Sequence, residues 1–222
     1  MGRASRGALG AVVATLALSA CGARTVPGTV PSAYVPVAVA MPAPSPVPAS
    51  IAADLGPPVG YPGVWAVVIG IDDYPEGTPD LQGAVADAET MLRALDLAGV
   101  PLDHRYVLEG SAATGAAIAD ALRWLAAIAG PDATAVLSYA GHTEHLGGSS
   151  HALVAADGAR MFDTEVAALL APVQASATWL VFASCFGGGF SEAVAPGRVL
   201  TAAAGPDDVA YENTRVNGSY LI

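Results

Sequence analysis

An imidazole and a thiol are the side chains in this sequence best suited to nucleophilic chemistry. His142 ends the segment Ser138-Tyr139-Ala140-Gly141-His142, and Cys185 lies within residues 183–190, where three glycines follow it closely. A thiol beside an imidazole is the minimum equipment for cysteine catalysis, because the imidazole can take the thiol proton. The two residues therefore predict a Cys–His pair. The alternative is a buried, inert cysteine that packs as a small apolar side chain.

Each of these residues follows an expected β-strand. The apolar runs at 133–139 and 178–183 are short, and Gly130-Pro131-Asp132 separates the first of them from a preceding helix. The carboxyl ends of parallel strands meet at one edge of a sheet, where open α/β sheets bind their ligands. If the two strands are neighbours, His142 and Cys185 emerge side by side.

Strands and helices alternate along the chain, which is typical of a mostly parallel sheet covered by helices on both faces. The first strand is expected in the continuous apolar run 64–71, as in strands buried on both sides. Further strands are expected at 105–108, 152–155 and 199–203. Helices are expected at 82–97, after a Thr114 cap, and after an Asp163 cap as far as Leu170.

The first residues have the features of an export signal. Arg3 and Arg6 precede an apolar stretch, residues 8–18, that is too short to span a membrane as a permanent helix. This stretch ends in Leu18-Ser19-Ala20-Cys21, which resembles the lipobox of bacterial lipoproteins and implies that Cys21 carries lipid. An ordinary secretory signal with a chance cysteine is the alternative.

The sequence thus divides into three parts. Residues 1–21 are expected to be the lipoprotein signal peptide, and residues 22–60, rich in Pro, Ala and Val, an extended tether. Residues 61–222 have the length of one domain with a substantial core. We therefore expect a protein outside the cytoplasm, held at the cell membrane or envelope by its N-terminal lipid alone.

The charge of the chain excludes one class of partner. Its formal net charge is −11, and all nine cationic side chains are arginines. An acidic chain without a basic stripe argues against nucleic acid and against direct docking on anionic lipid. The acidity fits cationic substrates or a divalent cation, and equally simple solubility.

Four blocks, in order, resemble the caspase and metacaspase superfamily of cysteine peptidases. Residues 65–74 resemble its first strand, an IGI-N-x-Y pattern, and residues 81–88 resemble the L-x-G-x-x-x-D-A segment of its first helix. Residues 138–142 resemble its Y-x-G-H block, and residues 184–190 its S-C-x-S-G block. The resemblance implies a caspase-like α/β fold, a three-layer α/β/α sandwich. The last residues, 216–222, look like the start of an element that is cut off.

The resemblance also implies an endopeptidase that acts on a protein or peptide substrate. Cys185 would attack the scissile carbonyl while His142 moves the proton, and the backbone amides of Thr143 and Cys185 would hold the oxyanion. Asp87 matches one acid of the substrate pocket with which metacaspases bind Arg or Lys at P1, the substrate residue before the cleaved bond.

Two departures from the family pattern concern these roles. Thr143 stands where the family usually has a glycine, and threonine is much the stiffer residue. Ala183 stands where metacaspases usually have a second pocket acid. The sequence therefore only leans toward Arg or Lys at P1.

Two alternatives to the peptidase stay open. One is an inactive relative that acts as a binding module at the cell envelope; the other is a metal-dependent hydrolase that uses His142 and His145. His-x-x-His with no third ligand nearby is a weak zinc signal, so we expect no metal site and no required cofactor. Calcium activation, known for some metacaspases, stays open, because the resemblance assigns it no particular residues.

Overall fold

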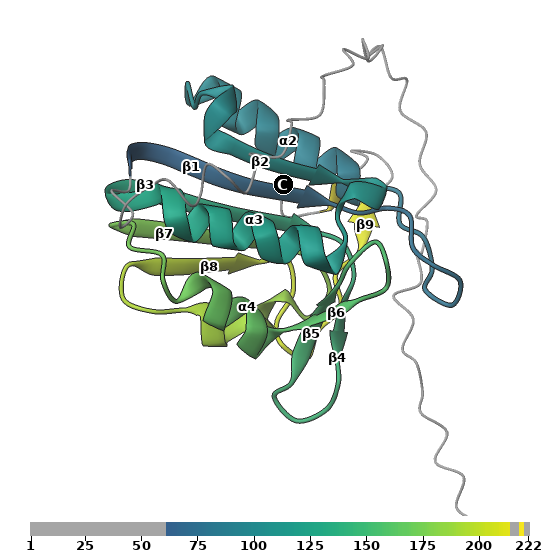
Figure 1. Cartoon of the computed structure of the whole chain (residues 1–222). Helices are drawn as coiled ribbons and strands as arrows, with labels where there is room; N and C mark the ends of the chain where they lie inside the picture. Colours follow the sequence, from purple (N-terminus) through teal and green to yellow (C-terminus); the bar gives the residue numbers. More distant parts are fainter. Residues whose placement is uncertain (1–60, 214–217, 220–222) are drawn as a thin grey trace, which may run out of the picture.

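A fully parallel sheet of five strands forms the centre of the computed structural model, which describes residues 61–213 and 218–219 (Figure 1). The strand order is β2-β1-β3-β7-β8, and every neighbouring pair is parallel. The strands are β1 (Tyr61–Gly70), β2 (Arg105–Glu109), β3 (Ala129–Ala140), β7 (Ala177–Ala183) and β8 (Arg198–Ala202). The expected signal peptide and tether lie outside the described residues.

Helices cover both faces of this sheet (Figure 1). Helix α2 (Ala84–Leu97) lies on one face, where Ala88, Met91 and Leu95 pack against side chains of β1 and β3. Helices α3 (Gly115–Ile128) and α4 (Asp163–Leu170) cover the other face and enclose the larger core. The expected three-layer α/β/α sandwich is thus confirmed.

Smaller elements gather beyond the carboxyl ends of the central strands (Figure 1). A three-stranded antiparallel sheet is formed by β4 (Thr143–His145), β5 (His151–Val154) and β6 (Arg160–Phe162). The short 3₁₀ helices η2 (Gly110–Ala112) and η3 (Gly187–Ala193) also follow central strands, whereas η1 (Leu102–His104) precedes β2 at its amino end. Strand β9 (Glu212–Asn213) pairs with β10 (Gly218–Ser219). Within the described residues, no helix is both long and apolar enough to cross a bilayer.

Local structure differs from the sequence expectation at two element starts. Strand β3 begins at Ala129, so the Gly130-Pro131-Asp132 segment ends helix α3 but also belongs to the strand. Asp163 is the first residue of α4 and not its cap, which is Phe162. By contrast, Thr114 caps α3 as predicted, because its hydroxyl accepts a hydrogen bond from the backbone N–H of Ala117 at 3.2 Å.

Replacing Thr114 with alanine should lower the free energy of unfolding by about 1 kcal/mol, because α3 loses its only side-chain cap. Chemical denaturation of the Thr114→Ala variant would measure this loss. Thr164→Ala, which alters an exposed threonine near the start of α4, serves as the control and should change stability by less than about 0.5 kcal/mol. Equal stability of the two variants would show that the Thr114 cap is unimportant.

Candidate active site

The register of β3 and β7 brings the two predicted catalytic residues to the same edge of the sheet. Ala140 and Ala183 are register partners at the ends of these adjacent parallel strands. His142 and Cys185 each lie two residues beyond them, and neighbouring strands are about 4.8 Å apart. Both side chains are largely buried, with 7% and 5% of their surface exposed. The sequence prediction that they emerge side by side is consistent with this topology.

The ring of His142 is oriented by a backbone carbonyl. Its Nε2 lies 2.7 Å from the carbonyl oxygen of Pro79, in the loop between β1 and α2. A carbonyl can only accept a hydrogen bond, so Nε2 must carry the proton that it donates. Nδ1 is then the ring nitrogen of neutral His142 that can accept a proton. Pro79 was not predicted from the sequence, since the contact is made by its backbone.

Two tyrosines hold the backbone of His142. The hydroxyl of Tyr74 accepts a hydrogen bond from the His142 N–H at 2.8 Å, and its ring centroid lies 4.7 Å from the imidazole. The hydroxyl of Tyr139 donates to the carbonyl of His142 at 2.6 Å and lies 3.0 Å from the carbonyl of Val154. A Cβ on Gly141 would lie within 2.8 Å of both hydroxyl oxygens, so only glycine fits between them.

Both tyrosines occur in blocks that carry the sequence resemblance, but no role was predicted for them. Tyr74 ends the block 65–74, and Tyr139 lies in the block 138–142. Their aromatic character and their spacing from His142 were visible in the sequence. Which backbone group each hydroxyl would meet depends on how the loop after β1 folds back over β3.

Cys185 sits at a sharp turn between β7 and η3. Phe186, the next residue, is the only described non-glycine residue with a positive φ, at 53°. This left-handed conformation costs about 1–2 kcal/mol for a residue with a Cβ. The Cys185 Sγ lies 3.6 Å from the carbonyl oxygen of Ala210, and the hydroxyl of Thr143 donates to the carbonyl of Cys185. This last contact joins the histidine segment to the cysteine turn directly.

The other predicted site residues occupy defined positions near this edge. Thr143 begins β4 and pairs with Leu153, so its stiff backbone has the extended conformation that β-branched residues favour. Asp87 lies in the first turn of α2 and is only 3% exposed. Ala84, one turn earlier, packs against Ala183 and Ala140 at the strand ends. Asp87 is therefore on the helix turn next to the cysteine strand.

The remaining histidines make separate contacts. His104 stacks on Trp65, with ring centroids 3.6 Å apart, and its role is structural. His145 stacks on His151, and Glu144 forms two hydrogen bonds with the guanidinium of Arg160. No three of the described His, Cys, Asp and Glu side chains are grouped so that they could hold a metal ion.

Two carboxylates lie at the start of α2, where backbone N–H groups are left without partners inside the helix. Asp72 accepts from the N–H of Ala84 at 2.8 Å, and Glu212, far along the chain, accepts from Gly83 at 2.8 Å. Burial raises the pKa of Asp72, and the nearby charge of Glu212 raises it further. The backbone N–H groups at the start of α2 thus hold two side-chain carboxylates, Asp72 and Glu212, whose charges repel each other.

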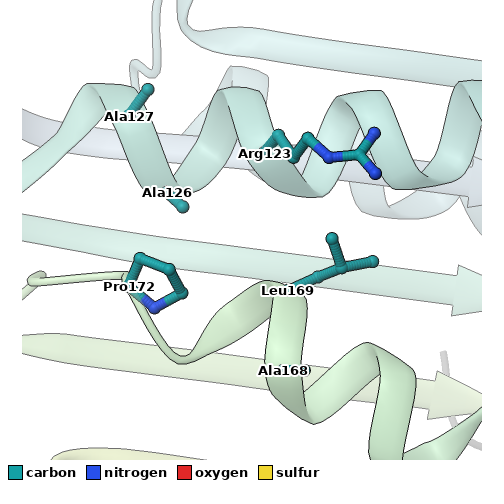
Figure 2. Close-up of a pocket in the computed structure, with 6 residues that line it drawn as sticks. All are labelled: Arg123, Ala126, Ala127, Ala168, Leu169 and Pro172. Atoms are coloured by element: carbon teal, nitrogen blue, oxygen red, sulfur yellow. The ribbon is translucent and has the colours of Figure 1, made fainter.

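A shallow apolar groove lies elsewhere on the molecule. Figure 2 shows it between α3 and α4, where Ala126, Leu169 and Pro172 line it together with Arg123. None of these residues belongs to the carboxyl edge of the sheet. The groove therefore has no part in the chemistry of Cys185 and His142.

A protein-family model supports the sequence resemblance. The family model described as the caspase domain matches residues 64–221. The crystal structure of protein GSU0716 from Geobacter sulfurreducens is 24% identical to this chain, with a TM-score of 0.48. That match covers 56% of this chain and 51% of the other, so the chain spans about half the length of that structure. No curated protein matches the chain.

The buried phenol of Tyr74 predicts a loss of stability at high pH. Burial is the largest cause that raises its pKa, from 10.0 to about 12. The folded protein therefore holds this proton more tightly than the unfolded chain, and the resulting stabilisation is present below pH 10 and lost as the pH rises toward 12. Between pH 9 and 12, Tyr74→Phe should lose about 2 kcal/mol less unfolding free energy than the native protein.

Denaturant titrations at the two pH values measure this difference. Tyr211→Phe, which removes an exposed phenol, is the control and should follow the native protein. If the native protein and Tyr74→Phe lose equal stability, the Tyr74 hydroxyl does not hold its proton in the way that its burial implies.

Proposed function

The chain belongs to the caspase-domain family, and on that premise we propose that it is a cysteine endopeptidase in which Cys185 is the nucleophile and His142 the general base. The observation that carries the proposal is the matched position of the two residues, each two residues past the paired ends of β3 and β7. The Pro79 carbonyl adds support, because it favours the tautomer in which Nδ1 is free to take the thiol proton.

The reaction follows the chemistry of a thiolate nucleophile. His142 accepts the Sγ proton, and Sγ attacks the scissile carbonyl carbon, so that a C–S bond forms and the carbonyl oxygen becomes an oxyanion. The backbone N–H groups of Cys185 and Thr143 would stabilise that charge. Collapse of the intermediate breaks the C–N bond, and the leaving amine takes the proton from His142. Water, activated by the same imidazole, then hydrolyses the thioester.

Asp87 is proposed to favour Arg or Lys at P1. It is a carboxylate on the turn of α2 that adjoins Ala84 and, through it, the Ala183 strand end. A buried carboxylate forms strong, charge-assisted hydrogen bonds with a guanidinium or ammonium group. Because Ala183 supplies no second acid, we expect a weaker preference than a pair of carboxylates would give.

The proposed setting is the cell membrane or cell envelope, outside the cytoplasm. Lipid on Cys21 and the Pro-rich segment 22–60 would hold the domain near the surface without inserting it. The substrate would then be a protein or peptide outside the cytoplasm. No cofactor is required by the proposed mechanism, and calcium is tested as an additive.

Cys185→Ala and His142→Ala should each lower kcat at least about a thousandfold, because each removes one half of the reacting pair. The assay uses the full chain and a peptide library that varies P1, with and without calcium. Cys185 is disulfide-bonded in the structure, so a reductant is present throughout and Cys185 is tested as a thiol.

His104→Gln is the control, since His104 stacks on Trp65 and should not affect turnover. If the folded native protein cleaves no peptide, the peptidase proposal fails and the inactive binding module takes its place. If activity survives Cys185→Ala but is lost with a chelator, the metal-dependent hydrolase is the correct reading.

Asp87→Asn should reduce kcat/KM for peptides with Arg at P1 by about tenfold or more, relative to peptides with an uncharged P1 residue. The neutral amide keeps the size of the side chain and removes its charge. Asp120→Asn, on the exposed surface of α3, is the matched control. An unchanged P1 profile would mean that Asp87 serves only as a favourable charge near the start of its helix.

A further inference from the structure

The segment that follows β8 crosses the candidate active site. Residues 204–212, called the strap below, run from η3 to the start of α2. The Ala204 carbonyl accepts from the Gly188 N–H at 2.9 Å, and the Asp208 carbonyl accepts from the Phe186 N–H at 2.8 Å. The strap is thus hydrogen-bonded to the turn that carries Cys185.

The middle of the strap lies beside the sulfur of Cys185. The carbonyl oxygen of Ala210 is 3.6 Å from the Cys185 Sγ. Attack on a peptide requires the scissile carbonyl carbon to come within about 3–3.5 Å of the same sulfur. A substrate carbonyl that approached the sulfur from the same side would meet the Ala210 carbonyl.

At its far end the strap is held by the Glu212 side chain, and Glu212 also belongs to β9, which pairs with β10. The Glu212 carboxylate accepts from the N–H of Gly83 at 2.8 Å and of Gln82 at 3.0 Å. Gly83 is the N-cap residue of α2 and has no side chain that could accept a hydrogen bond from the first turn. The Glu212 carboxylate, from a distant part of the chain, accepts hydrogen bonds at this helix end instead. Toward its other end, Nε2 of His151 lies 2.8 Å from the Pro206 carbonyl, and Asp207 pairs with His145 at 3.7 Å.

The exposure of the strap side chains indicates that the strap can detach locally while the rest of the domain stays folded. Val209 and Tyr211 of the strap are 40% and 53% exposed, and Asp207 and Asp208 are exposed as well. The strap therefore buries little apolar surface, and segments of this kind open at a small fraction of the global unfolding free energy. Repulsion between Glu212 and Asp72 at the start of α2 weakens the fastening further.

We propose that the strap, residues 204–212, is an autoinhibitory cover that lies over Cys185, is fastened by Glu212 to the start of α2, and must swing away before a substrate reaches the thiol. The proposal rests on Cys185 being the nucleophile of the proposed peptidase. Its test reads the accessibility of the thiol, which can be measured whether or not the protein cleaves peptides.

Glu212→Ala should speed alkylation of Cys185 by iodoacetamide about fivefold to tenfold, because the strap loses its hydrogen bonds to α2. The reaction is run on the reduced, full chain and followed by mass spectrometry of the peptide that carries Cys185, which separates it from Cys21. The matched control is Glu165→Ala, which removes another carboxylate from the first turn of a helix, away from the strap. It should change the rate less than about twofold.

Equal alkylation rates in the native protein and both variants would overturn the strap proposal. Faster alkylation of Glu212→Ala together with faster peptide cleavage would support the strap and the peptidase together. Faster alkylation without any peptide cleavage would support the strap and count against the peptidase.

Hydrogen exchange of the native protein tests the same proposal if Glu212→Ala does not fold. The amides of Phe186 and Gly188, whose acceptors lie on the strap, should exchange at least about tenfold faster than amides in the centre of β3. Protection equal to that of β3 would mean that the strap opens only when the whole domain unfolds, and would overturn the proposal.

Discussion

The parallel pairing of β3 with β7 in a single register is the constraint on which the candidate site depends. Ala140 pairs with Ala183, so residues that follow the two strands by equal distances leave the sheet at the same height. A shift of one residue would turn every side chain of a strand to the opposite face and would bury the wrong set. The packing that holds β3 and β7 in register therefore also sets the distance between the starts of the two loops that carry His142 and Cys185.

Hydrogen bonding then determines the local geometry beyond the strand ends. Loops at the carboxyl edge carry backbone groups that no strand satisfies, and buried groups of this kind need partners. The Tyr74 hydroxyl accepts a hydrogen bond from the His142 N–H, and the Tyr139 hydroxyl donates one to the His142 carbonyl. The Pro79 carbonyl accepts a hydrogen bond from the imidazole. The requirement to satisfy buried polar groups therefore also orients the imidazole.

Helix α2 links the substrate-binding candidate to the strap. Its first turn holds Asp87, and its free N–H groups are satisfied by the carboxylates of Asp72 and Glu212. Because Glu212 comes from the far end of the domain, the start of α2 is completed only when the strap lies across the site. If the strap moved as proposed, it would leave the side of Cys185, and this helix end would lose one of its caps. The two events are therefore coupled by the same hydrogen bonds.

The sequence by itself determined the order and type of the main elements, the Thr114 cap and the places of His142 and Cys185 just after two parallel strands. These features depend on hydrophobic periodicity, capping residues and short motifs, all of which are local. Only the tertiary structure decided that Pro79 orients His142, that the Thr143 hydroxyl reaches the Cys185 carbonyl, and that Glu212 caps a helix 130 positions earlier. Those contacts join backbone groups and side chains from distant segments, and a backbone carbonyl leaves no mark in the sequence.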